Sequence, residues 1–157
     1  MIYYCYRKWN TNRYILENKL RKADLCNIDY VGLLKMTIEC IFNEESTRSF
    51  FDPKFNTESI TEIDDGDYQG TLLYIIPEQW YQPSEYQYFM TYIAYGSCCC
   101  CDLLQSIQPS YISDVTDETI KDFMSLCRTF VANMIKPYNI GWRYSDNFEQ
   151  MSMNKEN

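Results

Sequence analysis

The spacing of apolar residues changes twice along this chain, from a helical period to an alternating one and back. In residues 31–41 apolar side chains recur at helical spacing, and Asp29 can cap a helix there. Residues 59–95 instead read as three extended segments, which are 59–63, 68–76 and 86–95. Residues 116–135 return to one apolar stripe, with acids in the first turn. This order predicts an α+β domain: N-terminal helices, a three-stranded antiparallel meander and C-terminal helices.

Shorter patterns complete the predicted fold. Residues 10–22 are polar and basic with a few apolar positions, which is typical of a surface helix, and residues 102–107 predict one or two helical turns. Residues 43–56, polar and broken by a proline, are predicted to form a loop. Lys35 and Glu39 have the spacing of an i, i+4 ion pair on the solvent side of their helix.

The last predicted strand has one face rich in tyrosine. Alternation places on that face Tyr86, Tyr88, Met90, Tyr92 and Ala94. We favour burial, because tyrosine commonly packs its ring against the protein and leaves only its hydroxyl in water. The nearly continuous apolar run at 72–76 likewise suggests a strand covered on both faces. The alternative is a face left open as a binding surface.

The length of 157 residues matches one domain. We expect residues 1–140 to form it, with a basic segment at 1–22, and residues 141–157 to be a flexible acidic and polar tail. The chain has no apolar run of membrane-spanning length, and its first residues lack the pattern of a signal peptide. We therefore expect a cytoplasmic protein that does not contact membranes and keeps its thiols reduced.

Charge is unevenly distributed. The net charge is −8, yet residues 1–22 hold six bases and one acid. Between Lys54 and Lys121 there are eleven acids and no Lys or Arg. Such a body repels a phosphate backbone, so we expect no direct binding of nucleic acid. It favours a basic protein partner or mimicry of nucleic acid, while solubility is the simplest explanation.

Four consecutive cysteines, 98–101, follow the tyrosine-rich strand and precede a predicted helix start near Asp102. Unpaired N–H groups at a helix start stabilise a thiolate, so Cys98 and Cys101 could exchange disulfides. They could also supply two of four zinc ligands, with further thiols from Cys5, Cys26, Cys40 or a second chain. Thiols that merely pack at a strand–helix junction are the simplest reading.

The order of three motifs resembles a family of small bacteriophage and prophage proteins with patterns close to DDGDYQGT, YQPS and YGSCSGCDTLQ. The matching segments here are Asp64 to Thr71, Tyr81 to Ser84 and Tyr95 to Gln105, within residues 28–136. The chain departs from the pattern at Cys99, Cys100 and Leu103. At Cys100 a side chain replaces a glycine at a position that tolerates a positive φ in the family pattern, so we expect a cost in backbone energy. The resemblance implies a phage origin, and the cytoplasm of an infected cell, but no activity.

No histidine, phosphate-binding loop or catalytic triad is present, which disfavours an enzyme. The leading hypothesis is a non-enzymatic, phage-type accessory protein without a cofactor that binds a host or viral protein through an acidic, aromatic surface. The predicted binding residues are Asp64, Asp65, Gly66, Asp67, Tyr68, Gln69, Trp80, Tyr81, Gln82, Pro83, Tyr95, Ser97, Cys98, Cys101 and Asp102. The alternatives are a Cys98/Cys101 site for zinc or disulfide exchange, and a nucleic-acid mimic that inhibits a host defence protein. The leading hypothesis also predicts that the three segments containing these residues, 64–69, 80–83 and 95–102, form a single surface.

Overall fold

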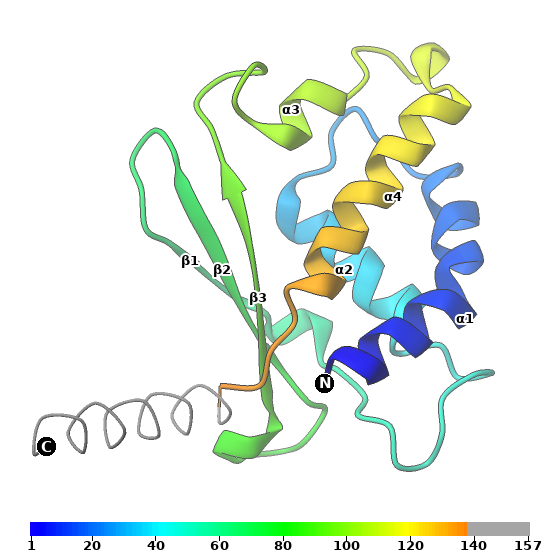
Figure 1. The fold of residues 1–157 in the computed structure, drawn as a ribbon, viewed down its shortest axis with the longest axis vertical. Coiled ribbons are helices and arrows are strands. Elements are labelled where there is room, and N and C mark those ends of the chain that lie inside the picture. Colours follow the sequence, from blue (N-terminus) through cyan, green and yellow to red (C-terminus); the bar gives the residue numbers. More distant parts are fainter. Residues whose placement is uncertain (138–157) are drawn as a thin grey trace, which may run out of the picture.

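In the computed structural model, which describes residues 1–137, a layer of helices covers one face of a three-stranded antiparallel sheet (Figure 1). The predicted α+β architecture is confirmed. The α-helices are α1 (Ile2–Leu20), α2 (Tyr30–Ile41), α3 (Leu103–Ile107) and α4 (Asp117–Ala132), and the strands are β1 (Thr61–Asp64), β2 (Gly70–Pro77) and β3 (Tyr88–Tyr95). Short 3₁₀ helices lie at Thr57–Ser59, Glu85–Gln87 and Ile112–Asp114. The predicted tail, 141–157, lies outside the described residues.

Local sequence explains why the two central helices form where they do. The Asp29 carboxylate accepts a 2.7 Å hydrogen bond from the backbone N–H of Gly32 and so caps α2. Thr116 and Thr119 cap α4 reciprocally, each side-chain oxygen accepting from the other residue's backbone N–H at 3.2 Å. The apolar stripe of α4 lies against β3, where the Thr91 hydroxyl donates to the Phe130 carbonyl at 2.6 Å. α1 packs against both α2 and α4.

The register of the sheet decides which loops lie together. β2 pairs with β3 from Gly70 opposite Tyr95 to Pro77 opposite Tyr88. Residues 65–69 and 96–102 therefore lie at one end of the sheet, and residues 78–87 at the other. Beyond α4 the chain returns along the outer edge of β3, where Met90 and Ile135 exchange two backbone hydrogen bonds.

The first helix differs from its prediction. It begins at Ile2 and is not confined to the surface, because Leu16 and Leu20 are fully buried. Lys8 is only 2% exposed. Its ammonium lies 2.7 Å from a carboxylate oxygen of Asp52 and donates to the Thr47 carbonyl at 3.0 Å. A buried lysine is tolerated here because its charge is paired and hydrogen-bonded.

The predicted Lys35–Glu39 pair is wrong. Lys35 instead lies 3.5 Å from the Glu58 carboxylate, and Glu39 accepts a hydrogen bond from the Thr57 hydroxyl at 2.5 Å. Both partners come from the 3₁₀ turn that follows the long loop, so tertiary contacts replace the pair within the helix.

The predicted burial of both sheet faces is also wrong. Phe89, Thr91 and Ile93 point into the core, but the opposite face of β3 is open, with Tyr92 44% exposed. On the same open face Ile63 of β1 is 45% exposed, directly across from Leu73. The alternative of an open tyrosine-rich face is therefore correct, although Tyr86 belongs to a 3₁₀ turn and not to the strand. The four helices of the described chain all lie on the same side of the sheet (Figure 1).

Within residues 1–137 no helix is both long enough and apolar enough to cross a bilayer.

Candidate functional site

The three motifs expected to share one surface lie at opposite ends of the sheet. The glycine-bearing turn (64–69) and the cysteine turn (96–102) form one end, which we call the acid–thiol end. The tryptophan loop (78–84) lies at the other, because Pro77 and Tyr88 pair at the far end of eight-residue strands. Strands of this length span roughly 25 Å. The expectation of a single patch is therefore wrong, and each end is described by itself.

At the acid–thiol end, acids fasten the turn between β1 and β2. The Asp64 carboxylate accepts from the backbone N–H of Gly66 at 3.0 Å and lies 2.7 Å from the Tyr95 hydroxyl. This hydrogen bond and partial burial raise the pKa of Tyr95 to about 12. The Asp65 carboxylate accepts from the Thr71 N–H at 2.5 Å. Asp67, Tyr68 and Gln69 are left exposed on the turn.

Glycines at this end are required by close packing. A Cβ on Gly66 would clash with the Gln69 carbonyl, and one on Gly96 would lie 2.6 Å from the Cys101 sulfur. No residue of the described chain has a positive φ. The expected backbone cost at Cys100 is therefore wrong, because that position does not need the conformation in which glycine is favoured.

The cysteine turn brings the outer two thiols together. The sulfur atoms of Cys98 and Cys101 lie 3.0 Å apart, and the Cys98 backbone N–H donates to the Cys101 sulfur at 3.2 Å. The Ser97 hydroxyl lies 3.8 Å from the same sulfur. Hydrogen bonds from the Cys98 and Ser97 side chains lower the pKa of Cys101. The stabilisation of a thiolate that was expected from a helix start thus comes from hydrogen-bond donors in the turn itself. The helix α3 has only five residues and begins after Asp102.

Asp102 anchors this turn and is buried, so it is not the surface residue that was predicted. One of its carboxylate oxygens accepts from the Tyr30 hydroxyl at 3.1 Å and from the Gln105 N–H at 2.8 Å. The other accepts from the Gly96 N–H at 3.2 Å. The carboxylate therefore ties the end of β3 to α2 and α3 and fixes the position of the thiols between them.

The remaining cysteines do not join this pair to form a metal site. Cys5, Cys40 and Cys127 are buried in helices. Burial raises the pKa of Cys5 to about 11 and that of Cys127 to about 12. Over residues 1–137 no three His, Cys, Asp or Glu side chains are arranged to hold a metal ion. The zinc alternative thus has two thiols and no third ligand in this part of the chain.

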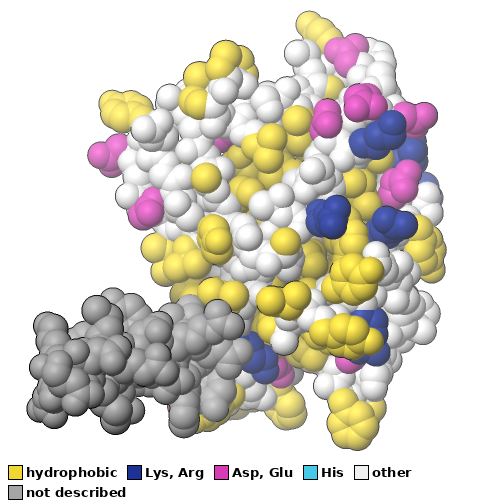
Figure 2. Space-filling view, in the orientation of Figure 1, with side chains coloured by type: hydrophobic (Ala, Val, Ile, Leu, Met, Phe, Trp, Pro, Cys, Tyr) yellow, Lys and Arg dark blue, Asp and Glu magenta, His cyan; other side chains and the backbone are white. Residues whose placement is uncertain are grey.

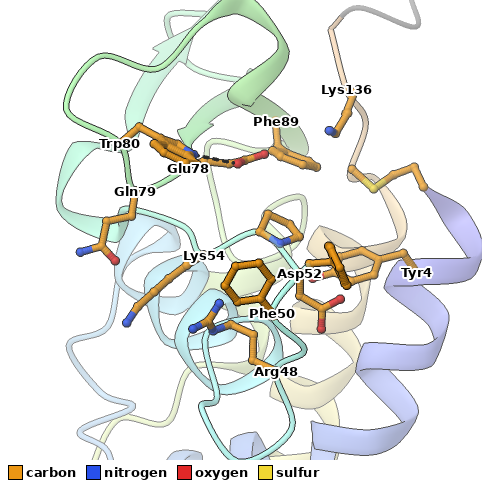
Figure 3. A pocket seen from close by; sticks show the side chains of 13 residues that line it. Tyr4, Arg48, Phe50, Asp52, Lys54, Glu78, Gln79, Trp80, Phe89 and Lys136 are labelled. Atoms are coloured by element: carbon orange, nitrogen blue, oxygen red, sulfur yellow. Dashed lines mark hydrogen bonds between the residues drawn. The ribbon is translucent and has the colours of Figure 1, made fainter.

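The other end of the sheet carries a cavity of about 560 Å³ (Figure 3). We call it the aromatic pocket, and its lining includes Tyr4, Arg48, Phe50, Phe51, Trp80, Phe89 and Lys136. These side chains come from α1, the 43–56 loop, the tryptophan loop, β3 and the segment after α4. In Figure 3 Trp80 and Phe89 face Phe50 and Tyr4 across the opening.

Large aromatic side chains at this pocket are exposed to solvent. Phe50 is 92% exposed, Phe51 91% and Trp80 61%, and the neighbouring Tyr81 is 99% exposed. The two phenylalanine rings pack edge to face with their centres 5.5 Å apart. Gln82 is exposed and Pro83 half-buried on the same loop. Exposed aromatic groups gathered in this way are typical of binding surfaces.

Charges around the aromatic pocket favour anions. Its two acids already have partners: Asp52 pairs with Lys8, and Glu78 accepts from the Trp80 indole N–H at 3.2 Å. Lys54 and Arg48 share Glu45, at 2.6 and 3.2 Å. The Lys136 ammonium lies 4.6 Å from the centre of the Phe89 ring, and no carboxylate in residues 1–137 forms an ion pair with it.

Two polar atoms of the pocket lining are buried without a hydrogen-bond partner among the described residues. They are the Tyr4 hydroxyl and Nε of Arg48. Buried donors are normally paired, so these two atoms are exceptions among the described residues.

Sequence reasoning found Trp80 and Tyr81 but missed the opposite wall. Two adjacent phenylalanines in an otherwise polar loop were the available signal, since such residues are normally buried. The contribution of Tyr4 and Lys136 could not be found in this way, because they belong to the two ends of the described chain.

Comparisons of this chain with protein-family models, with curated proteins and with solved structures give no match.

Proposed function

We propose that this chain is a non-enzymatic accessory protein that binds another protein, and that the aromatic pocket receives a segment of that partner. The observation that carries the proposal is the group of exposed aromatic side chains, Phe50, Phe51 and Trp80, around a cavity of about 560 Å³. Three exposed aromatic groups lower solubility, and burying their large apolar area against a partner would stabilise the complex.

The chemistry of the lining favours a particular segment: an aromatic or aliphatic side chain next to a carboxylate. The apolar side chain would fill the space between Phe50 and Trp80. The carboxylate would pair with Lys136, whose ammonium has no carboxylate partner among the described residues. It could instead pair with Arg48 or Lys54, which both form ion pairs with Glu45. The charge of Asp52 is offset by Lys8, whose ammonium lies 2.7 Å away, so an acid that enters on the side of Asp52 and Lys136 meets less repulsion than one beside Glu78.

The resemblance to phage proteins supports a host or viral protein as the partner. The base-free acids that suggested a basic partner gather in part at the acid–thiol end, around Asp64, Asp65 and Asp67. A basic surface would therefore bind there, and the aromatic pocket would take the acidic segment.

Mimicry of nucleic acid has less support. A mimic needs acids in a continuous row that imitates phosphates. On the face shown in Figure 2 the Asp and Glu side chains form separate groups, with hydrophobic and uncharged surface between them. The same face shows Lys and Arg beside hydrophobic side chains over α1 and α4, where Arg13 and Arg128 line a second cavity of about 430 Å³.

A displayed random-peptide library tests the proposal. Panned on the full chain, it should enrich peptides with an aromatic or aliphatic residue next to Asp or Glu. Phe50→Ala or Trp80→Ala should weaken the affinity of these peptides at least about tenfold, the loss of one anchor of about 1.4 kcal/mol. Lys136→Ala should weaken binding less and reduce its dependence on salt.

The matched control is Tyr111→Ala, which removes another exposed aromatic, 71% accessible, from the segment before α4. Any host protein captured by the wild-type chain should likewise be lost with Trp80→Ala and kept with Tyr111→Ala. Basic peptides whose binding is lost with Phe50→Ala or Trp80→Ala, or acidic peptides that bind these variants as tightly as the wild type, would overturn the proposal.

A further inference from the structure

We propose that Cys98 and Cys101 form a redox-active dithiol that exchanges with the disulfide of another molecule, an activity separate from binding at the aromatic pocket. Their sulfur atoms are 3.0 Å apart, about 1 Å more than an S–S bond, so a small side-chain movement suffices to join them. Both thiols are exposed. A disulfide in solution can therefore reach them.

The turn holds the two thiols in this arrangement before any reaction. The Cys101 and Asp102 backbone N–H groups both donate to the Cys98 carbonyl, at 2.9 and 2.8 Å. Gly96 lets Cys101 approach the end of β3, where a side chain would collide with the sulfur. Asp102, buried and accepting three hydrogen bonds, fixes the far side of the turn. Such preorganisation favours the closing of the intramolecular disulfide over reaction with a second molecule.

The polar contacts assign different roles to the two thiols. The Cys98 N–H donates to the Cys101 sulfur, and the Cys98 thiol and the Ser97 hydroxyl are within reach of it. A thiolate at Cys101 is therefore stabilised by groups in the turn, which makes Cys101 the attacking residue and Cys98 the resolving one. This geometry determines which thiol attacks first, because no backbone N–H in the described chain donates to the Cys98 sulfur.

The exchange balances in two steps. The Cys101 thiolate attacks one sulfur of the substrate disulfide; a Cys101–substrate S–S bond forms, the substrate S–S bond breaks, and the other sulfur leaves as a thiolate that takes a proton from water. Cys98 then loses its proton to water and attacks the Cys101 sulfur, which releases the second substrate thiolate. The protein is oxidised by two electrons to the Cys98–Cys101 disulfide, and the substrate disulfide is reduced to two thiols.

The surrounding charge selects the substrate. Asp64, Asp65 and Asp67 lie at the same end of the sheet, and no Lys or Arg occurs between residues 54 and 121. A disulfide that carries positive charge should thus approach faster than an anionic one. The probes are cystamine, which is cationic, and glutathione disulfide, which is anionic.

The first experiment oxidises the reduced full chain with each probe and maps the products by mass spectrometry. The variant C99S/C100S should lose two hydrogen atoms through a Cys98–Cys101 disulfide, and faster with cystamine than with glutathione disulfide at low salt. With C98S added, the mixed disulfide at Cys101 should accumulate, because the resolving thiol is gone. Absence of the Cys98–Cys101 product from C99S/C100S would overturn the proposal.

The second experiment measures the rate of iodoacetamide alkylation against pH for chains with one thiol left in the turn. Cys101 alone (C98S/C99S/C100S) should react about 3- to 10-fold faster at pH 7 than Cys98 alone (C99S/C100S/C101S). Cys26, half-buried and with its pKa raised by burial, is the slow internal reference in both chains. Equal rates for the two single-thiol chains would overturn the assignment of Cys101 as the attacking residue. Circular dichroism checks that each variant is folded.

Discussion

A buried lysine and aspartate hold the loop that makes one wall of the aromatic pocket. Lys8 reaches from α1 to Asp52, and Asp52 also accepts a 2.9 Å hydrogen bond from the Ser49 N–H. Phe50 and Phe51 lie between these two contacts in the chain. The ion pair therefore fixes the backbone beside the exposed rings, and a single charge on α1 helps to position a surface that begins 42 residues further on, at Phe50.

We predict that Lys8→Met lowers the free energy of unfolding by about 1–3 kcal/mol, because Asp52 loses its 2.7 Å ion pair and keeps only Arg7, at 3.4 Å, and the Ser49 N–H. Urea denaturation monitored by tryptophan fluorescence measures this loss. Lys22→Met, which removes an exposed base from the same N-terminal segment, is the control and should change stability by less than about 0.5 kcal/mol. A Lys8 variant as stable as the Lys22 variant would contradict the role assigned to the buried pair.

The same pair predicts how stability depends on pH. Burial acts to raise the pKa of Asp52, but hydrogen bonds from Lys8 and the Ser49 N–H, with the charges of Lys8 and Arg7, outweigh it and lower the pKa. A lowered pKa in the folded state contributes stability above the unfolded value of about 3.9, which is lost as pH falls through the folded pKa. Asp52→Asn lacks this contribution. The stability difference between wild type and Asp52→Asn should therefore be large at pH 7 and shrink below about pH 4; a difference that stays constant down to pH 3 would be the opposite result.

Little at this scale was predictable from the sequence. Lys8 is one of six bases in residues 1–22, and nothing local distinguishes it from the other five. Its burial depends on a partner 44 positions away. Asp102 is a similar case: the predicted helix start near it is confirmed, but the sequence did not indicate that its carboxylate caps this helix or accepts hydrogen bonds from Tyr30 and Gly96.

At the scale of elements, those with a strong local period were predicted and those placed by tertiary contacts were not. The apolar stripe on α4 and the cap on α2 depend only on residues close together in the sequence. Both helices, and the sides of them that are buried, were therefore predicted. The open face of β3 was misjudged because its side chains, tyrosine, methionine and alanine, are equally compatible with a covering layer and with solvent. The 43–56 loop was recognised as a loop, but its position across from Trp80 depends on pairing between Phe55 and Glu78.

Asn43 joins this loop to the end of α2 and provides the element-scale prediction. Its side-chain amide donates to the Phe55 carbonyl at 2.9 Å and accepts from the Phe55 N–H at 2.8 Å. Asn43→Ala leaves both buried backbone groups unpaired, so we expect a loss of about 1–3 kcal/mol and faster amide hydrogen exchange in residues 44–54. Asn10→Ala, on the exposed side of α1, is the control. Exchange in the loop that matches wild type would show that other contacts hold it.

At the scale of the whole molecule, the separation of the two ends follows from the meander itself. In an antiparallel sheet, consecutive connections lie at opposite ends, so the 64–69 turn and the tryptophan loop cannot meet across β2. The predicted antiparallel strands already implied that the two loops lie at opposite ends of the sheet. The prediction of a single binding surface was inconsistent with them. What the strands could not supply is the second wall of the aromatic pocket, because Tyr4, Phe50 and Lys136 reach it from three separate parts of the chain.

The separation predicts that the two ends act independently. Groups more than about 10 Å apart that share no contacts contribute additively, within about 0.3–0.5 kcal/mol, and the strands hold these ends roughly 25 Å apart. Trp80→Ala should therefore leave the alkylation rate of Cys101 within about twofold of wild type. C98S/C101S should likewise leave peptide affinity within about twofold, and the combined variant should show both losses unchanged. A coupling above about 1 kcal/mol would contradict independence and show that a change at the cysteine turn is transmitted through the sheet to the aromatic pocket.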